Sequence, residues 1–300
     1  MNNYHNPVLL SNCIDGLDIK PNGIYVDATY GGGGHSKEIL KKLNKKGKLL
    51  AFDQDEDVKP NLIQDERFTF INGNFCRLEA FLKLYNAYPV DGILADLGVS
   101  SHQFDVPERG FSIRFDAPLD LRMNNKKGIT ASEFIENATS EEIAKVLYNY
   151  GDFYNSKVLA NAIERYKNDC KIITVEDLKK ALIKYAPKGK ENSFFARVFQ
   201  ALRIEINNEL EVLKDFLAQT IDALKPGGRL VVISYHSLED KLVKNIMKSG
   251  KINGILEKDF YGNIINPLIP LTKKPIVPDE EEISANNRAR SAKLRIAVKY

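Results

Sequence analysis

Three aspartates in the first hundred residues each end a short apolar segment, and one of them leads into a run of glycines. Asp27 precedes Gly31–Gly34, Asp53 ends the next apolar segment, and Asp96 ends a third. Because glycine has no Cβ, successive glycines let backbone N–H groups approach a ligand, and the start of a following helix favours negative charge. An acid about 20 residues further on is where nucleotide-binding α/β folds hold ribose hydroxyls. The two features together predict a cofactor that contains adenosine.

The arrangement of the glycines separates two classes of adenosine cofactor. The dinucleotide fingerprint G-x-G-x-x-G places its glycines around a pyrophosphate, whereas this chain has four consecutive glycines after a carboxylate. Asp27 would repel a pyrophosphate and attract an ammonium group. We therefore expect S-adenosylmethionine (SAM), whose methionine part carries an amine. An NAD-dependent oxidoreductase is the alternative, which nicotinamide binding would support.

Histidines and cysteines supply the remaining candidates for chemistry. His236 follows the fifth expected strand, where it fits a proton acceptor or a base-contacting residue, and a helix-capping role fits the same position. His5 is a candidate to close over the site. The cysteines are widely separated and the histidines have no H-x-x-x-H spacing, so the sequence predicts no metal site and no disulfide framework.

The composition is that of an ordinary globular protein. The chain has 300 residues, of which 43% are hydrophobic and 28% are charged, enough for one large domain or one domain with an insertion. Its first residues lack a secretory signal, and no apolar run reaches the roughly 18–20 residues of a membrane span. We therefore expect a cytoplasmic protein without a membrane partner.

Short apolar segments alternate with helical patterns over the first hundred residues. Strands are expected at 24–28, 48–52, 68–72 and 90–98, with helices at 36–43 and 77–85. Near-continuous apolar strands separated by helices are typical of a parallel sheet covered on both faces. Since ligands bind at the carboxyl ends of such strands, we expect Asp27, Asp53 and Asp96 to lie at one edge of the sheet.

From residue 107 to residue 203 the sequence shows helix signals only. Capping-box spacings begin at Thr130, Thr139 and Thr174, and Gly151 is expected to end the second of these helices. The stretch therefore predicts a helical subdomain that is inserted into the sheet domain.

The pattern of the sheet domain then resumes. Apolar residues at intervals of three and four over 206–224 predict one long helix, which a Pro-Gly-Gly sequence ends. A fifth strand is expected at 229–234, followed by a capped helix that opens at Ser237. An alternating strand at 292–299 is expected to close the edge of the sheet, and the proline-rich stretch 267–278 is expected to be a loop.

Two segments have a composition that fits contact with RNA. No acid follows Glu282, while five basic residues lie from Arg288 to Lys299, which fits phosphate contact or a solvated strand face. The stretch 188–197 mixes basic with aromatic residues, which fits base stacking. Buried helix packing explains Phe194 and Phe195 in that stretch equally well.

Seven segments converge on one family. They are YHNPVLL at 4–10, DATYGGGGHS at 27–36, DLGVSS at 96–101, RGFS at 109–112 with PLDLRM at 118–123, FQALRIEIN at 199–207, ISYHSLED at 233–240 and NRARSAKLR at 287–295. Together they resemble the ribosomal RNA small subunit methyltransferase H family of bacteria, also known as MraW. The match runs in order over nearly the whole chain, and the combined motifs are highly specific.

The resemblance implies an α/β fold of the class I SAM-dependent methyltransferases, a Rossmann-like, mostly parallel, doubly wound sheet with an inserted all-helical subdomain. Residues 1–106 and 204–300 would form the SAM-binding domain, and 107–203 the inserted substrate-recognition domain. The implied reaction is methylation of the exocyclic N4 of one cytidine in the decoding region of 16S rRNA. The implied partner is therefore the small ribosomal subunit or its 16S rRNA, and no DNA partner is expected.

By motif position, the resemblance also implies the residues that contact SAM. They are Gly33, Gly34, His35, Asp53, Phe75, Asp96 and Gln103. The backbone around Gly33 would meet the methionine end, Asp53 would accept the ribose hydroxyls, and Phe75 would pack on adenine. Asp96 and Gln103 would line the pocket near adenine or the transferred methyl group.

Asp96 is also the expected catalytic residue. Many amino-methyltransferases have an acid or asparagine, two prolines and an aromatic residue at this strand end, whereas this chain continues Leu97-Gly98-Val99 and keeps only the acid. We expect Asp96 to orient the cofactor or to accept a hydrogen bond from N4, and a role in SAM binding alone is the alternative. A non-catalytic assembly factor on the same scaffold is a second alternative, against which the intact glycine run, Asp53 and Asp96 argue.

Overall fold

A computed structural model describes residues 7–300, which divide into two compact units. Unit 1 joins the described residues up to Gly98 to Leu210–Tyr300, and unit 2 is the continuous stretch Val99–Glu209. The stretch that forms unit 2 is several residues longer at each end than the expected insert, 107–203. His5 and the start of the first family segment lie outside the described residues.

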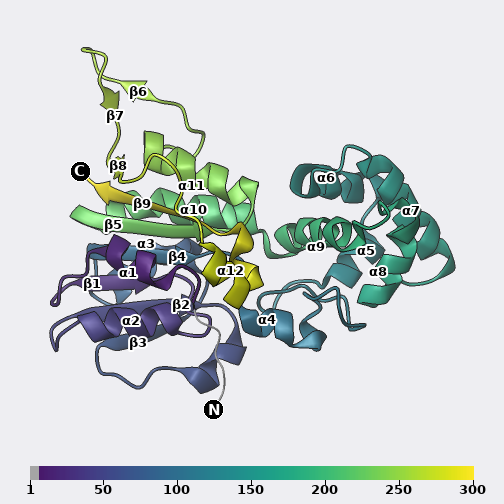
Figure 1. The fold of residues 1–300 in the computed structure, drawn as a ribbon, viewed down its shortest axis with the longest axis horizontal. Helices are drawn as coiled ribbons and strands as arrows, with labels where there is room; N and C mark the ends of the chain where they lie inside the picture. The colour runs from purple at the N-terminus through teal and green to yellow at the C-terminus, as the bar shows by residue number, and fades with distance from the viewer. Residues whose placement is uncertain (1–6) are drawn as a thin grey trace. The chain divides into compact units, whose positions relative to one another are not determined.

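Unit 1 contains a seven-stranded sheet with the strand order β3-β2-β1-β4-β5-β9-β8. The strands are β1 (Ile24–Asp27), β2 (Lys48–Asp53), β3 (Phe68–Asn72), β4 (Val90–Asp96), β5 (Leu224–Ser234), β8 (Leu268–Pro270) and β9 (Lys293–Lys299). Neighbouring strands from β3 to β5 pair in parallel, and β9 is antiparallel to both β5 and β8 (Figure 1). The predicted α/β fold with a mostly parallel sheet is confirmed. The strand order reverses between β1 and β4, which is where open α/β sheets bind their ligands.

Helices cover both faces of this sheet, which explains why its strands read as continuous apolar runs. The helices of this part of the chain are α1 (Leu10–Leu17), α2 (Gly34–Lys42), α3 (Leu78–Leu84), α10 (Glu209–Ala223), α11 (Ser237–Ser249) and α12 (Glu280–Ala285), with short 3-10 turns at Glu56–Asn61, Phe75–Arg77 and Asn287–Ser291. The adjacent residues Ile93 and Leu94 of β4 are both fully buried, but Ile93 packs in the core with α3, α10 and α11, and Leu94 in the core with α1 and α2.

Unit 2 is helical. Its helices are α4 (Ser101–Asp105), α5 (Ala131–Asn137), α6 (Ser140–Gly151), α7 (Ser156–Asp169), α8 (Val175–Leu182) and α9 (Glu191–Asn207), with 3-10 turns at Pro107–Arg109 and Ile183–Tyr185. The three predicted capping boxes are confirmed, since Thr130, Thr139 and Thr174 each exchange hydrogen bonds with the residue three positions on. As predicted, Gly151 ends α6, and the residue that adopts the left-handed conformation after it is Asp152.

The basic and aromatic stretch in α9 belongs to the core of unit 2. Phe194 and Phe195 are 7% and 2% exposed, and the Phe194 ring packs edge-on against Phe153 with centroids 5.2 Å apart. Arg197 donates to the carbonyl oxygen of Gly151 and lies over the Phe153 ring. The base-stacking hypothesis is therefore wrong for these two rings, and the packing alternative is correct.

The single long helix expected over 206–224 is wrong, because Asn208 separates α9 from α10. Asn208 has a φ of 51°, a left-handed conformation that asparagine tolerates better than most residues. Apolar spacing continues through the break because Ile206 packs against the core of unit 2, whereas Leu213 and Leu217 pack in the core of unit 1. A hydrophobic pattern does not record which core each residue enters.

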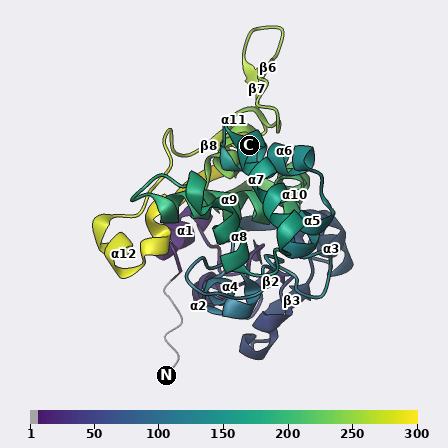
Figure 2. The same cartoon turned by 90° about the vertical axis from the view of Figure 1, so that its right-hand side faces the viewer.

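The edge of the sheet also differs from the expectation. β9 is an inner strand, and the edge is β8, a three-residue strand from the proline-rich stretch that was expected to be a loop. Proline is compatible with an edge strand, because the outer side of such a strand has no neighbouring strand to which an N–H group would have to donate a hydrogen bond. The preceding residues form a hairpin of β6 (Glu257–Lys258) and β7 (Ile264–Ile265), which stands clear of its neighbours in two perpendicular views (Figure 2).

Among residues 7–300, no helix combines the length and the apolar character needed to cross a membrane.

Candidate cofactor and active site

Asp27 holds the loop between β1 and α2 in place. Its Oδ2 accepts a hydrogen bond from the Ser36 hydroxyl at 2.7 Å, and its Oδ1 accepts one from the Thr29 N–H at 3.1 Å. The residue is only 1% exposed, and burial raises the pKa of its carboxyl group to about 6. Asp27 therefore shapes the loop, and its expected attraction for the ammonium group of the ligand stays a prediction.

The glycine turn needs glycine for a steric reason as well as a conformational one. Gly33 has a φ of 73°, and a Cβ there would lie 2.7 Å from the Tyr30 ring. Tyr30 is 3% exposed and its hydroxyl donates to the carbonyl oxygen of Asn61, so the ring is not free to move away. A Cβ on Gly34 would lie 2.1 Å from Cγ of Pro7. The turn is thus a place where only bare backbone fits, as close approach of a ligand requires.

We expect Gly33→Ala to lower the free energy of unfolding by about 1–3 kcal/mol more than Gly227→Ala, because overpacking adds to the backbone strain. Gly227 is a matched control, since its φ is 77° but no atom lies within 4 Å of the position that a Cβ would take there. Urea unfolding of both variants measures the difference. Equal losses would show that the Tyr30 ring yields without cost.

The segment before α1 packs against this turn. The ring of His35 places Nε2 3.2 Å from the carbonyl oxygen of Val8, and burial lowers the pKa of that histidine. The N–H of Leu9 donates to Oε1 of Glu282 at 2.6 Å, so a residue near the other end of the chain holds the segment. His35 is therefore a buried side chain whose neutral form is favoured by burial, consistent with a site in which its backbone rather than its ring meets the cofactor.

Asp53 links the glycine turn to the end of β2. Its Oδ2 accepts from the Gly31 N–H at 2.8 Å, and its Oδ1 accepts from the Asp55 N–H at 2.9 Å. A carboxylate has about four acceptor positions, so each oxygen retains one for a further donor. Asp53 is also less completely buried than Asp27, although burial raises the pKa of its carboxyl group to about 6. The two remaining acceptor positions of Asp53 fit hydrogen bonds from the two hydroxyls of a ribose.

Phe75 lies beyond the end of β3, in a short turn that Asn74 caps through a 2.9 Å bond from the Cys76 N–H. Its ring packs against Phe216 at a centroid distance of 4.9 Å and an interplanar angle of 67°. The side chain is half-buried. A ring that is fixed on one side and partly exposed fits packing against a flat base.

Asp96 lies at the end of β4, beside β1, and Tyr235 holds one of its oxygens. The Tyr235 hydroxyl donates to Oδ1 at 2.8 Å, and the backbone N–H of Asp96 donates to Oγ1 of Thr29 at 2.7 Å. Burial raises the pKa of Asp96 to about 6, while the nearby His35 and the Tyr235 bond act in the opposite direction. Burial and Asp96 both raise the pKa of Tyr235, so its hydroxyl remains a donor at neutral pH.

Sequence reasoning missed Tyr235 and chose its neighbour His236. The signal was present, because parallel strands that are neighbours in a sheet bring the residues beyond their carboxyl ends together. Ile233 of β5 is in register with Asp96, which places Tyr235 just past the end of the strand next to β4.

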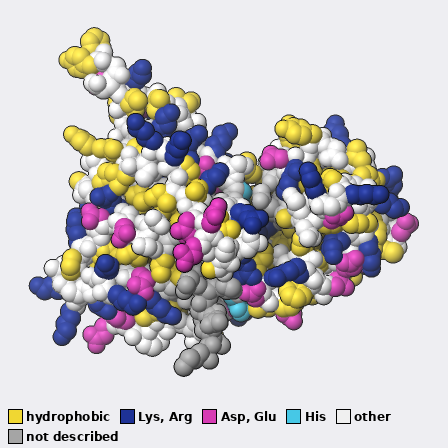
Figure 3. Space-filling model, viewed as in Figure 1, with side chains coloured by type: hydrophobic (Ala, Val, Ile, Leu, Met, Phe, Trp, Pro, Cys, Tyr) yellow, Lys and Arg dark blue, Asp and Glu magenta, His cyan; other side chains and the backbone are white. Residues whose placement is uncertain are grey.

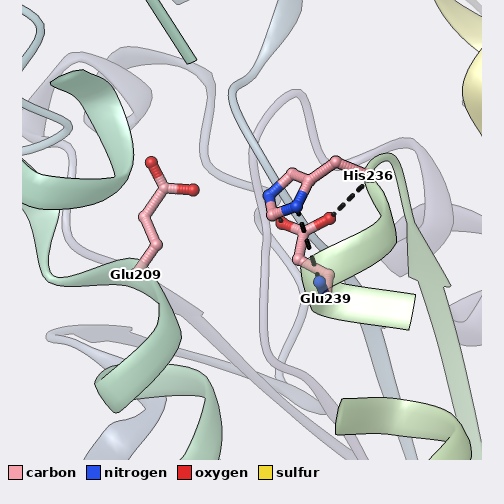
Figure 4. Close-up of side chains that lie close together, drawn as sticks. All are labelled: Glu209, His236 and Glu239. Carbon is pink, nitrogen blue, oxygen red and sulfur yellow. Dashed lines mark hydrogen bonds and ion pairs between the residues drawn. The ribbon is translucent and has the colours of Figure 1, made fainter. Parts of the chain in front are cut away.

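His236 is the N-cap of α11, which supports the capping alternative. Its Nδ1 accepts from the Glu239 N–H at 3.5 Å (Figure 4). In addition, Oε2 of Glu239 accepts from the Tyr235 N–H at 2.8 Å. The His236 ring also places Nε2 3.2 Å from Oε1 of Glu239. Glu209, drawn in the same figure, belongs to unit 2 and forms a two-bond ion pair with Arg203. The capping box begins at His236, one residue before the expected Ser237.

Gln103 and the basic C-terminal segment have structural contacts of their own. Within unit 2, Gln103 exchanges hydrogen bonds with Ser100 to cap α4, and its contact with SAM stays a prediction. In unit 1, Arg295 forms two hydrogen bonds with Asp240, and Lys299 donates to the carbonyl oxygen of Leu224. At least these two of the five basic residues offered for phosphate contact are thus engaged inside the fold, and Lys293 also lies 3.9 Å from Oδ2 of Asp240.

The site in unit 1 therefore brings together Gly33, Gly34, His35, Asp53, Phe75 and Asp96 at the carboxyl ends of β1, β2, β3 and β4. A glycine turn before a helix, an acid at the end of the second strand and a fixed aromatic ring beyond the third define a class I SAM-dependent methyltransferase. The chain belongs to the MraW methylase family, which matches residues 2–300. The resemblance drawn from the sequence motifs is confirmed, and SAM rather than NAD is the cofactor.

Two relatives with similar sequences agree with this assignment. A protein of Flavobacterium johnsoniae named ribosomal RNA small subunit methyltransferase H is 56% identical over 296 residues, covering 99% of this chain and 98% of the relative. A protein of Bacteroides thetaiotaomicron with the same name is 52% identical over 296 residues, covering 99% and 97%. Among solved structures, an rRNA methylase from Streptococcus thermophilus covers 99% of both chains with a TM-score of 0.44 and 12% identity.

Proposed function

We propose that this protein methylates the exocyclic N4 of one cytidine in the decoding region of 16S rRNA, acting in the cytoplasm on the small ribosomal subunit or its RNA. The observation that carries the proposal is the full-length match to relatives named ribosomal RNA small subunit methyltransferase H at more than 50% identity. Asp96 at the carboxyl edge of the sheet supplies a group that suits this chemistry. The helical unit is proposed to take part in recognising the RNA.

The difficulty of the reaction lies in the nucleophile. N4 of cytosine is weakly nucleophilic because its lone pair is delocalised into the ring. Bound SAM supplies an electrophilic methyl group on a sulfonium. An acceptor that takes a hydrogen bond from N4–H, and then its proton, makes the nitrogen more electron-rich as the transition state forms.

Asp96 is the proposed acceptor, and Tyr235 is its positioning residue. Because the Tyr235 hydroxyl occupies Oδ1, the carboxylate is fixed in rotation and Oδ2 is the oxygen left for the substrate. The bond between the Asp96 N–H and Thr29 ties the same residue to the glycine loop. The backbone around Gly33, Gly34 and His35 is proposed to meet the methionine end of SAM. Contacts with the ribose and adenine are assigned to Asp53 and Phe75.

The test is methyl transfer from labelled SAM to undermethylated small subunits and to naked 16S rRNA, followed by nucleoside analysis. We expect N4-methylcytidine at one position, and the better substrate shows at which stage the enzyme acts. SAM binding without transfer to either substrate would favour a non-catalytic assembly factor. A methyl group on another atom would overturn the N4 assignment.

The pH dependence tests the role of Tyr235. We expect kcat/KM to fall as the pH drops through about 6, since Asp96 must be ionised to accept a proton. Tyr235→Phe removes a donor that stabilises the ionised form, so the pKa of Asp96 rises and the acid limb moves to higher pH by about 0.5–1 unit. Other titratable groups that act on Asp96 are His35, Asp27, Glu239 and Cys13.

Tyr25→Phe is the matched control for this experiment. Tyr25 is a fully buried tyrosine of β1 whose hydroxyl accepts from the Lys20 N–H, and it makes no hydrogen bond to Asp96. The control should leave the acid limb in place. An unshifted limb in Tyr235→Phe would assign the pH dependence to another group.

A further inference from the structure

The turn of the β6–β7 hairpin presents two aromatic rings to solvent. Phe260 is 98% exposed and Tyr261 is 86% exposed, and the two rings meet edge-on with centroids 5.8 Å apart. Four aliphatic residues of the same hairpin are also exposed: Ile255, Leu256, Ile264 and Ile265. Exposed apolar side chains that gather in one place mark an interaction site more often than single, scattered ones do.

The turn that carries these rings is ordered by its own hydrogen bonds. Oδ1 of Asp259 accepts from the N–H groups of Tyr261 and Asn263 at 2.9 and 2.8 Å, and its Oδ2 accepts from the Asn263 side chain at 3.0 Å. The N–H of Gly262 donates to the Asp259 carbonyl oxygen at 3.0 Å. Because the turn is preformed, binding through Phe260 and Tyr261 loses less conformational entropy than binding through a flexible loop.

Both ends of the hairpin are fastened to α11. The Asn245 side chain donates to the carbonyl oxygen of Ile252 at 2.9 Å, and the Asn266 side chain donates to that of Met247 at 2.9 Å. The hairpin and α11 therefore belong to one surface within unit 1, as the ribbon shows (Figure 1).

The same stretch concentrates positive charge. Residues 241–278 contain seven lysines and two acids, a net charge of +5, whereas the whole chain carries +3, so the remainder is net negative. The lysines are Lys241, Lys244, Lys248, Lys251, Lys258, Lys273 and Lys274. The first three are exposed and recur at intervals of three and four, which places them on one face of α11. Lys and Arg side chains gather below the apolar tip of the hairpin (Figure 3).

Both acids of the stretch are engaged inside the hairpin. Glu257 is paired with Lys251, and Asp259 accepts the hydrogen bonds of the turn, which lower the pKa of its carboxyl group. The negative charge of Glu257 is thus balanced by Lys251, and Asp259 stays ionised as the acceptor that orders the turn. Lys244, Lys248 and Lys258 have no acidic partner among the ion pairs of residues 7–300.

We propose that the hairpin surface, formed by Phe260 and Tyr261 together with the lysines of residues 241–258, binds ribosomal RNA outside the methylation site. The lysines contact backbone phosphates, and the two rings stack on unpaired bases. This assignment rests on the proposed function for the identity of the RNA. RNA is favoured over a protein or a lipid surface because it alone offers both a phosphate at every residue and flat faces for aromatic rings.

Two variants test the proposal in the full-length protein. The tip variant is Phe260→Ala with Tyr261→Ala, and the charge variant combines Lys244→Gln, Lys248→Gln and Lys258→Gln. The control replaces Lys42, Lys45 and Lys46, three exposed lysines around the end of α2, by glutamine, which removes the same charge elsewhere in unit 1. Binding to undermethylated small subunits and to naked 16S rRNA is measured by filter retention at several KCl concentrations, with kcat and KM for methyl transfer alongside.

The tip variant should bind RNA about tenfold more weakly, as expected for the loss of one or two stacked bases. The charge variant should reduce the slope of log K against log salt by about two to three, because each phosphate contact contributes about 0.7–0.9. In both variants KM should rise, while kcat at saturating RNA, SAM affinity and the unfolding temperature stay near those of the parent.

The possible outcomes separate this proposal from the proposed function. Variants that bind RNA as tightly as the lysine control would overturn the hairpin assignment even if the parent methylates rRNA. Weaker binding to assembled subunits but not to naked RNA would also overturn it and indicate a ribosomal protein as the partner. If the parent binds RNA through the hairpin but transfers no methyl group, the hairpin assignment stands and the proposed function fails.

Discussion

Asp96→Asn slows methyl transfer by about 10³-fold at saturating substrates, with SAM affinity within about threefold of that of the parent. This expectation follows from the position of the carboxylate, which has one oxygen held by Tyr235 and the other left for the substrate. Asparagine keeps the size of the side chain and can still accept from Tyr235, but it cannot take a proton. General-base groups in this role contribute about 10²–10⁴ in rate.

Single-turnover kinetics and calorimetry together measure this effect. The first gives the rate of the methyl-transfer step, and the second gives the SAM dissociation constant. Tyr235→Phe serves as a graded comparison, since it leaves the carboxylate in place but loosens its orientation. A fall in SAM affinity that matches the fall in rate would reduce Asp96 to a cofactor-binding residue.

Asp53→Ala is expected to have the largest effect on the cofactor, weakening SAM binding by about 1.5–3 kcal/mol, or roughly 10- to 150-fold. Two losses contribute. The ribose hydroxyls lose a charged acceptor, and the Gly31 and Asp55 N–H groups lose the carboxylate that joins the glycine turn to β2. Calorimetric titration with SAM gives the dissociation constant directly.

Asp53→Asn separates the two losses, because asparagine retains one acceptor oxygen and the size of the side chain. We expect it to weaken SAM by less than the alanine variant and to leave the unfolding temperature closer to that of the parent. Unchanged SAM affinity in Asp53→Ala would contradict the ribose assignment. Equal weakening in both variants would show that the charge matters more than the connection to the turn.

Residues at the ends of long apolar strands could be predicted because two local patterns coincide there. A buried strand needs a continuous apolar run, and the polar residue that ends the run marks its end, so the positions of Asp53 and Asp96 at strand ends were both predicted. The capping boxes at Thr130, Thr139 and Thr174 were predicted for a similar reason, since each is complete within four residues. Such features depend on near neighbours in the chain.

The features that were not predicted depend on distant residues. The structural contacts of Asp27 were not predicted, because Ser36 and Thr29 cannot be recognised as its hydrogen-bond partners from spacing alone. Tyr235 was missed because its importance arises only when β5 pairs with β4. Strand β8 and the hairpin were missed because strands of two or three residues are too short to show an alternating pattern.

Unit 1 is built from two separate stretches of the chain, with unit 2 between them, and this arrangement determines which parts of the protein can fold first during synthesis. Unit 2 is a continuous stretch with its own core, so all of its residues are available before β5 is made. Strand β4 can pair with β1 early, but its other side must wait for β5, and the Leu9 segment beside the glycine turn must wait for Glu282, which lies 273 residues further on. Since domains form as their residues emerge, the helical unit matures first and the cofactor site last. A nascent chain therefore cannot complete these contacts beside the SAM site until Glu282 has been translated.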